Sequence, residues 1–163
     1  MAADYCTVGG YYYLITVDRF SNWPDIKRVV QNSHNSGAAG LIKVLKRFFA
    51  TFGVPRELSS DGGPEFIAKE NRDFLQRWGV SHRLSSAYNP RSNGRAEVAV
   101  KSMKRLLQDN VSPNGDIDSE GYVRAILQLR NTPDPMNGIS PSEVVFGRPL
   151  RDVLPVKPRY MIM

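Results

Sequence analysis

Alternating apolar and polar positions near the start of the chain predict a β-hairpin. Residues 2–8 (AADYCTV) and 11–17 (YYYLITV) are rich in aromatic and β-branched side chains, and only a Gly-Gly pair separates them. Two glycines tolerate the positive φ angles of a two-residue hairpin turn. A turn of that length fixes the register and places Asp4 opposite Ile15, on the sheet face that Cys6 also occupies.

Apolar residues recur at helical spacing farther along the chain. Between residues 35 and 53 they fall at positions i, i+3, i+4, i+7 and i+11, and Gly53 and Pro55 follow as stop signals. The same criteria predict three more strands, at 25–30, 56–60 and 81–85, and further helices at 69–79, 93–109, 119–131 and 140–147. This order of elements predicts an α/β fold with a mixed five-stranded sheet and helices on both faces.

Composition and charge narrow the class of protein. Of the 163 residues, 41% are hydrophobic and 23% are charged, so we expect one soluble, intracellular domain without a membrane span or signal peptide. Cys6 is the single cysteine and there are two histidines, which excludes an intrachain disulfide and a zinc cluster and leaves oxygen ligands for any metal. The net charge of +6 favours a polyanionic partner, nucleic acid before membrane.

Aspartates beside or within the predicted strands are candidates for chemistry. Asp61 directly follows the strand at 56–60 and precedes two glycines, where a turn without a chemical role is the simple interpretation unless other carboxylates lie nearby. Asp4 lies within a strand among Tyr, Cys and Ile, where a carboxylate is costly unless it is paired or binds metal. We therefore prefer Asp4 to Asp18, for which we predict a role in capping the turn before Trp23.

A third acid, Glu97, lies on the helix predicted at 93–109. It shares a helical face with Lys101 and Lys104, and a solvated ion pair with Lys101 is the simple interpretation. The preceding segment NPRSNG contains glycine and arginine, which is typical of a mobile loop that closes on a backbone phosphate. Together, a carboxylate, two lysines and an arginine indicate a metal ligand beside a DNA track.

The acids Asp61 and Glu97 lie in two recognisable segments, SSDGGPEF and YNPRSNGRAE, with thirty-five residues between them. Two further segments are ADYCTVGGYYYLITVDRFSNWP near the start and GISPSEVVFGR near the end. In their order along the chain, the four segments resemble the catalytic core of retroviral and gypsy-type long-terminal-repeat (LTR) retrotransposon integrases. The resemblance runs nearly from end to end. The final segment is the one most similar to the gypsy-type group.

This resemblance implies a ribonuclease H-like fold, with residues 1–147 as the catalytic core and 148–163 as a C-terminal linker. It implies that Asp4, Asp61 and Glu97 form a catalytic, metal-binding triad for two Mg²⁺ or Mn²⁺ ions. The implied reactions are 3′-end processing of element DNA and its strand transfer into target DNA. The residues implied in DNA binding are Tyr88, Arg91, Asn93, Lys101 and Lys104.

The resemblance also implies partners. The N-terminal zinc-binding domain and the C-terminal DNA-binding domain of the family are missing here, so we expect an excised core that forms a homodimer, acts in the nucleus and is limited to the reverse, disintegration reaction. Phe49 lies off the main apolar stripe of its helix, where it belongs either to the edge of the core or to a dimer interface.

Other interpretations stay open. The chain is alternatively a domesticated, non-catalytic integrase descendant that binds DNA or dimerises, although the intact triad argues against this. A ribonuclease H-type nuclease or a cut-and-paste transposase would share the fold, but the thirty-five-residue interval and the last helix favour an integrase. The remaining alternative is a basic globular domain whose acids are surface residues.

Overall fold

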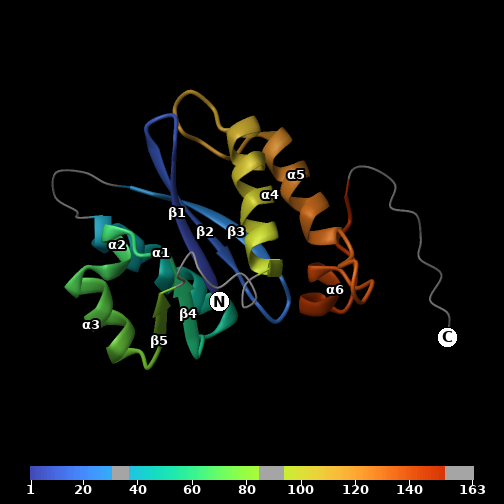
Figure 1. Cartoon of the computed structure of the whole chain (residues 1–163). Helices are drawn as coiled ribbons and strands as arrows, with labels where there is room; N and C mark the ends of the chain where they lie inside the picture. Colours follow the sequence, from blue (N-terminus) through green and yellow to red (C-terminus); the bar gives the residue numbers. More distant parts are fainter. Residues whose placement is uncertain (31–36, 85–93, 153–163) are drawn as a thin grey trace.

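A mixed five-stranded sheet forms the centre of the molecule (Figure 1). The structure is a computed structural model and describes residues 1–30, 37–84 and 94–152. In the spatial order β3-β2-β1-β4-β5, the strands are β1 (Ala2–Val8), β2 (Tyr11–Val17), β3 (Pro24–Val29), β4 (Glu57–Ser60) and β5 (Ser81–Leu84). β1 to β3 are antiparallel, whereas β1, β4 and β5 run parallel, so the sheet is mixed as predicted.

The N-terminal hairpin has the predicted register. Gly9 and Gly10 have φ angles of 59° and 82°, which a tight two-residue turn requires. Asp4 lies opposite Ile15. On that face of the sheet Tyr13 and Ile15 are completely buried, so Asp4 emerges beside an apolar cluster.

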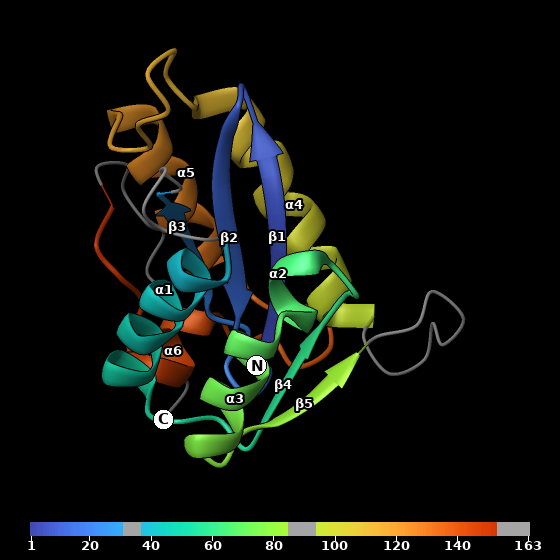
Figure 2. The same cartoon turned by 90° about the vertical axis from the view of Figure 1, so that its left-hand side faces the viewer.

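Helices cover both faces of the sheet (Figure 1 and Figure 2). One face packs against α1 (Gly37–Phe52), α2 (Pro64–Ile67) and α3 (Lys69–Arg77), and the other against α4 (Gly94–Asn110) and α5 (Glu120–Asn131). The sequence did not predict α2, a single turn too short to show helical periodicity. In the described part of the chain, no helix has the length and apolar character needed to cross a membrane.

The last helix, α6 (Pro141–Phe146), packs against α5 and has the expected capping signals. The side chain of Ser140 accepts a hydrogen bond from the backbone N–H of Glu143, and the Glu143 carboxylate accepts one from the backbone N–H of Ser140. Gly147 ends the helix in the left-handed conformation. Leu150 is then held by two hydrogen bonds to Asn131, and the predicted linker residues 153–163 lie outside the described residues.

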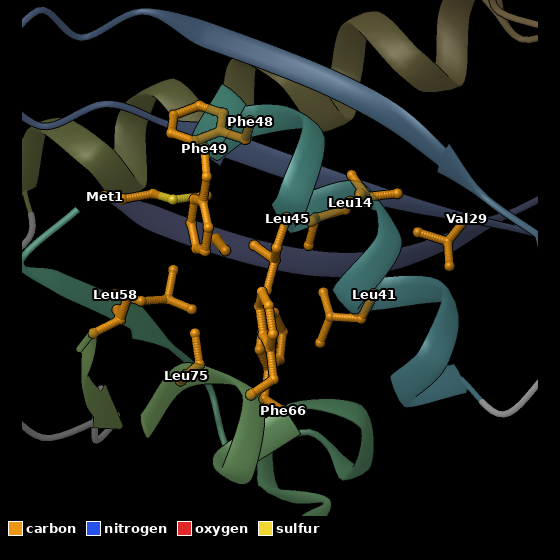
Figure 3. Close-up of a cluster of buried hydrophobic side chains, with 14 residues drawn as sticks. Met1, Leu14, Val29, Leu41, Leu45, Phe48, Phe49, Leu58, Phe66 and Leu75 are labelled. Carbon is orange, nitrogen blue, oxygen red and sulfur yellow. The ribbon is translucent and has the colours of Figure 1, made fainter. Parts of the chain in front are cut away.

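A hydrophobic cluster on each face joins the helices to the sheet. Figure 3 shows the cluster in which Leu14 and Leu58 of the sheet pack against α1 and its neighbours. Phe49 belongs to this cluster, with 4% of its surface exposed, and stacks on Phe74 at a centroid distance of 5.9 Å. The core interpretation of Phe49 is therefore confirmed, and its assignment to an exposed dimer interface is wrong.

The loop between α4 and α5 is fastened to the tip of the hairpin. The hydroxyl of Tyr13 donates a 2.6 Å hydrogen bond to the carbonyl oxygen of Gly115. Gly115 has a φ of +83°, and a Cβ at this position would lie 2.6 Å from the ring of Tyr11. Only glycine combines this backbone conformation with such a close approach.

Gly115→Ala is expected to lower the free energy of unfolding by about 2–4 kcal/mol. Left-handed strain contributes about 1 kcal/mol, and overpacking against Tyr11 adds about 1–3 kcal/mol. Urea unfolding followed by circular dichroism measures the loss. Gly138→Ala is the matched control, because Gly138 has a φ of +72° but no neighbouring atom within 4 Å of the methyl group that alanine would add. Equal losses in the two variants would contradict the steric argument.

Candidate active site

Two aspartates lie near the point where the parallel strands β1 and β4 pair. β1 and β4 pair with Ala2 opposite Ser59, and Asp4 and Asp61 each lie two residues farther along the chain. Two residues of extended chain return a side chain to the same face of a sheet. The register therefore directs both carboxylates to the face covered by α4, with Asp61 at the point where β4 ends.

Lys104 of α4 lies against this pair. Its Nζ is 2.7 Å from Oδ2 of Asp4, and the charge of Asp61 also acts on it. The hydrogen bond to Asp4 raises the pKa of Lys104, although partial burial opposes this effect. The sequence analysis assigned Lys104 to DNA and did not foresee an ion pair with Asp4, because β1 and α4 are far apart in the sequence.

Glu97 occupies a different position. It is exposed on the first turn of α4, seven residues before Lys104. Seven residues are about two helical turns, so the two side chains share a face but are separated by about 10 Å along the helix axis. Lys104 thus forms an ion pair with Asp4 and feels the charge of Asp61, whereas Glu97 lies at the N-terminal end of the same helix.

The turn after Asp61 orients its carboxylate. The backbone N–H of Gly63 donates a 3.1 Å hydrogen bond to Oδ1 of Asp61. A Cβ on Gly63 would lie 3.1 Å from the same oxygen, closer than most side chains tolerate. A larger residue at position 63 would require the carboxylate of Asp61 to shift by a few tenths of an ångström.

Comparison with known proteins decides the family. Residues 2–90 match the family described as integrase core domain, which is more than half of the 163-residue chain. The chain belongs to the integrase core domain family.

The relatives of this integrase core include retroviral polyproteins. The Gag-Pol polyprotein of feline leukemia virus is 32% identical over 142 residues, which cover 86% of this chain and 8% of the polyprotein. The Pol polyprotein of radiation murine leukemia virus is 31% identical, with coverages of 86% and 24%. An uncharacterized protein of Caenorhabditis elegans is 29% identical over 148 residues, with coverages of 90% and 11%. The integrase core thus spans less than a quarter of each of these relatives.

Solved structures share the fold of this integrase core. A chain of the simian T-cell lymphotropic virus intasome in complex with PP2A regulatory subunit B56 gamma has a TM-score of 0.68 at 19% identity, covering 97% of this chain and 58% of that chain. The catalytic core domain of BIV integrase has a TM-score of 0.64 at 20% identity, with coverages of 88% and 90%. The predicted ribonuclease H-like fold is therefore confirmed.

The Asp4–Asp61 pair of the integrase core suits a hard divalent cation. Carboxylate oxygens are the ligands that Mg²⁺ and Mn²⁺ prefer. In this structure the positive charge next to Oδ2 of Asp4 is the ammonium group of Lys104. Within residues 1–30, 37–84 and 94–152, no three acidic, histidine or cysteine side chains gather around one point. The assignment of Asp4, Asp61 and Glu97 as metal ligands therefore stays a prediction, and in the described residues Glu97 does not gather with the two aspartates.

The structure does not test the residues that are predicted to bind DNA. Three of the residues assigned to DNA binding, Tyr88, Arg91 and Asn93, lie outside the described residues. Lys101 is exposed on α4, and its contact with DNA stays a prediction.

Asp18 has the predicted structural role. Its Oδ2 accepts hydrogen bonds from the backbone N–H and the hydroxyl of Ser21, at 3.0 and 2.6 Å. These bonds close the turn between β2 and β3, ahead of Trp23. Capping of this turn is therefore confirmed.

Cys6 lies two residues beyond Asp4 on the same face of the sheet. Burial, assisted by the negative charge of Asp4, raises the pKa of its thiol from 9.0 to about 11. In buffer with EDTA at about pH 8, alkylation by iodoacetamide is expected to be about 100-fold slower in the folded than in the urea-unfolded chain, because only the thiolate reacts. Mass spectrometry follows the reaction, and the folded-state rate should rise about tenfold per pH unit up to about pH 11. Equal rates in both states would contradict this prediction.

Ser60 and His82, which lie next to Asp61 in the fold, were not predicted from the sequence as site residues. Ser60 is the last residue of β4, and its Oγ lies 2.7 Å from Nε2 of His82 on β5. The only signal in the sequence was the polar character of both residues within predicted strands. Their contact depends on the parallel register of β4 and β5, which pairs Leu58 with His82.

Proposed function

We propose that this chain is the catalytic core of the integrase of an LTR retroelement, which processes the 3′ ends of element DNA and joins them to target DNA. One observation carries the proposal: in a member of the integrase core domain family, Asp4 and Asp61 each lie two residues beyond the Ala2–Ser59 pair of two parallel strands, and Lys104 of the helix that bears Glu97 contacts Asp4. The retroviral polyproteins among the relatives support a retroelement origin. The segments near the C-terminus favour a gypsy-type LTR retrotransposon over a retrovirus.

In this proposal Asp4, Asp61 and Glu97 would hold two divalent cations, Mg²⁺ or Mn²⁺, with Glu97 brought to the two aspartates when the ions bind. The chemistry that such ions supply is activation of an attacking oxygen and charge stabilisation of the leaving oxygen in an in-line displacement at phosphorus. The attacking oxygen belongs to water in 3′ processing and to the 3′-hydroxyl of the element in strand transfer. No covalent bond to the protein is needed in either reaction.

The remaining residues of the proposed site orient the carboxylate of Asp61 or bind the DNA ends. Gly63 orients the carboxylate of Asp61 through its backbone N–H. Lys101 and Lys104 of α4, with Tyr88, Arg91 and Asn93 of the preceding segment, contact the DNA ends, and phosphate contacts of this kind fix the position of DNA without reading its sequence. Because Lys104 is bound to Asp4 here, its DNA contact requires release from that carboxylate.

The proposed function also suggests domain limits, an oligomeric state and a cellular location for the protein. We propose residues 1–147 as the catalytic core and 148–163 as a linker to a further domain of a longer polyprotein, since the relatives are much longer than this chain. The active unit is a homodimer, and chromosomal target DNA places its action in the nucleus. The isolated core performs disintegration, the reverse of strand transfer.

A non-catalytic, integrase-derived DNA-binding module is the second candidate. It is favoured by the ion pair between Lys104 and Asp4, which neutralises one of the proposed metal ligands. Such a module would bind DNA through its net charge of +6 without a divalent cation.

A disintegration assay tests the proposed function. The chain is incubated with a branched DNA substrate in Mn²⁺, with EDTA as the metal-free control and an RNA–DNA hybrid as a second substrate. We expect resolution of the branched DNA in Mn²⁺, no reaction in EDTA and an intact hybrid. Cleavage of the hybrid would instead indicate a ribonuclease H-type nuclease, and metal-independent DNA binding without reaction would favour the DNA-binding module.

A further inference from the structure

The end of β4 is held by a short chain of hydrogen bonds on the sheet face opposite the carboxylates. The hydroxyl of Ser60 donates to the backbone carbonyl oxygen of Asp61 at 3.0 Å, and Nε2 of His82 lies 2.7 Å from the same hydroxyl oxygen. A serine hydroxyl has one hydrogen to donate. With that hydrogen assigned to Asp61, the hydroxyl oxygen accepts from His82 in the tautomer that carries the proton on Nε2.

The position of this chain of bonds is suited to control Asp61. Among the described residues, β4 pairs with β5 as far as Ser60, and Asp61 is exposed and followed by two glycines. Without support, a strand end before a Gly-Gly pair has wide backbone freedom. Fixing the carbonyl of Asp61 limits its ψ angle, and the hydrogen bond from Gly63 then fixes the carboxylate.

His82 is itself well placed to be a fixed donor. Its side chain is partly buried, and its ring lies 6.3 Å from the ring of Phe66, which is completely buried. Burial lowers the pKa of His82, so the neutral ring carries one N–H at neutral pH, and the Nε2–H tautomer makes the ring the donor in its contact with Ser60.

We propose that His82 is a positioning residue that acts through Ser60 to orient the carboxylate of Asp61 for metal and substrate. This inference rests on the proposed function in so far as Asp61 is a metal ligand. Outer hydrogen-bond partners of metal ligands commonly change metal affinity or activity by about 10–100-fold. A histidine that only supports the β4–β5 pair would change stability without changing the orientation of Asp61.

The first test measures orientation without metal or activity. The amide of Gly63 reports on its bond to Asp61, and its hydrogen-exchange rate is measured by NMR in the parent chain and in variants. We expect exchange at least about tenfold faster in His82→Leu and in Ser60→Ala, because either change breaks the chain of bonds. His82→Gln keeps an N–H near the position of Nε2 and should remain within about threefold of the parent. Ser81→Ala, on the exposed side of β5, is the matched control and should have no effect.

The second test measures Mn²⁺ affinity by water proton relaxation, together with kcat and KM for disintegration. We expect about tenfold weaker Mn²⁺ binding and a lower kcat in His82→Leu, an unchanged KM for DNA, and rescue by His82→Gln. The double variant His82→Leu/Ser60→Ala should be no worse than either single variant, because both act in one chain.

The outcomes separate this inference from the proposed function. Exchange at Gly63 that is unchanged in His82→Leu and Ser60→Ala, or a His82→Gln variant as defective as His82→Leu, would overturn the positioning role. Unchanged Mn²⁺ affinity in Asp61→Asn would instead refute the proposed function. The exchange rate of Gly63 would then still decide whether His82 orients Asp61.

Discussion

Asp4→Asn, Asp61→Asn and Glu97→Gln are each expected to lower the rate of Mn²⁺-dependent disintegration by about 10³-fold or more. Each change removes a negative ligand of the proposed metal site while keeping the size of the side chain. Metal-assisted charge stabilisation contributes several kcal/mol to such a transition state, and about 4 kcal/mol corresponds to about 10³ in rate. Quantification of the resolved DNA strands over time measures the effect.

Asp18→Asn is the matched control for these variants. Asp18 is also an aspartate at the end of a strand, but its carboxylate caps a turn and asparagine retains an acceptor oxygen for Ser21. We expect its activity to remain within about threefold of the parent, since surface caps of this kind contribute only about 1 kcal/mol to stability. If Asp18→Asn were inactive and Asp4→Asn active, the assignment of the first carboxylate would be wrong.

Phe49→Ala is expected to lower the free energy of unfolding by about 3–5 kcal/mol. The side chain is buried and touches the rings of Phe74 and Trp78, with centroid distances of 5.9 and 5.8 Å. Its removal leaves a cavity in the cluster that holds α1 and α3 on the sheet, and losses of this size are typical of buried phenylalanine. Urea denaturation, followed by circular dichroism at several protein concentrations, measures the change.

Phe20→Ala is the control for this prediction. Phe20 is 89% exposed, so its removal should change stability by no more than about 0.5 kcal/mol. A contrary result would be a Phe49→Ala variant with parental stability and weaker self-association, which is the behaviour of an interface residue.

Local chemistry explains why much of the fold could be predicted from sequence. The Gly-Gly turn fixes the hairpin register and therefore the face that Asp4 occupies. The capping residues Ser140 and Gly147 fix the limits of α6. In each case a few adjacent residues determine the outcome, so no knowledge of distant contacts is needed.

Contacts between distant segments could not be predicted in the same way. The ion pair of Lys104 with Asp4 joins residues one hundred positions apart, and the contact of Ser60 with His82 depends on the pairing of β4 with β5. Phe49 shows the same limit, because the periodicity of α1 describes one apolar stripe while α3 covers a second side of that helix. The family resemblance implied that Asp4 and Asp61 belong to one site, and the parallel register of β1 and β4 supplies the structural reason.

The described contacts of α4 are distributed unevenly along the helix. The loop beyond its C-terminal end is bonded to Tyr13, and its middle is held by the buried side chains of Met103 and Leu107. Its first turn carries the exposed residues Glu97 and Val98. The described contacts therefore hold the C-terminal end and the middle of α4, whereas Glu97 lies at the opposite end. Two of the three proposed metal ligands therefore lie in or directly after a strand of the sheet, and the third lies at the end of α4 farthest from the loop bonded to Tyr13.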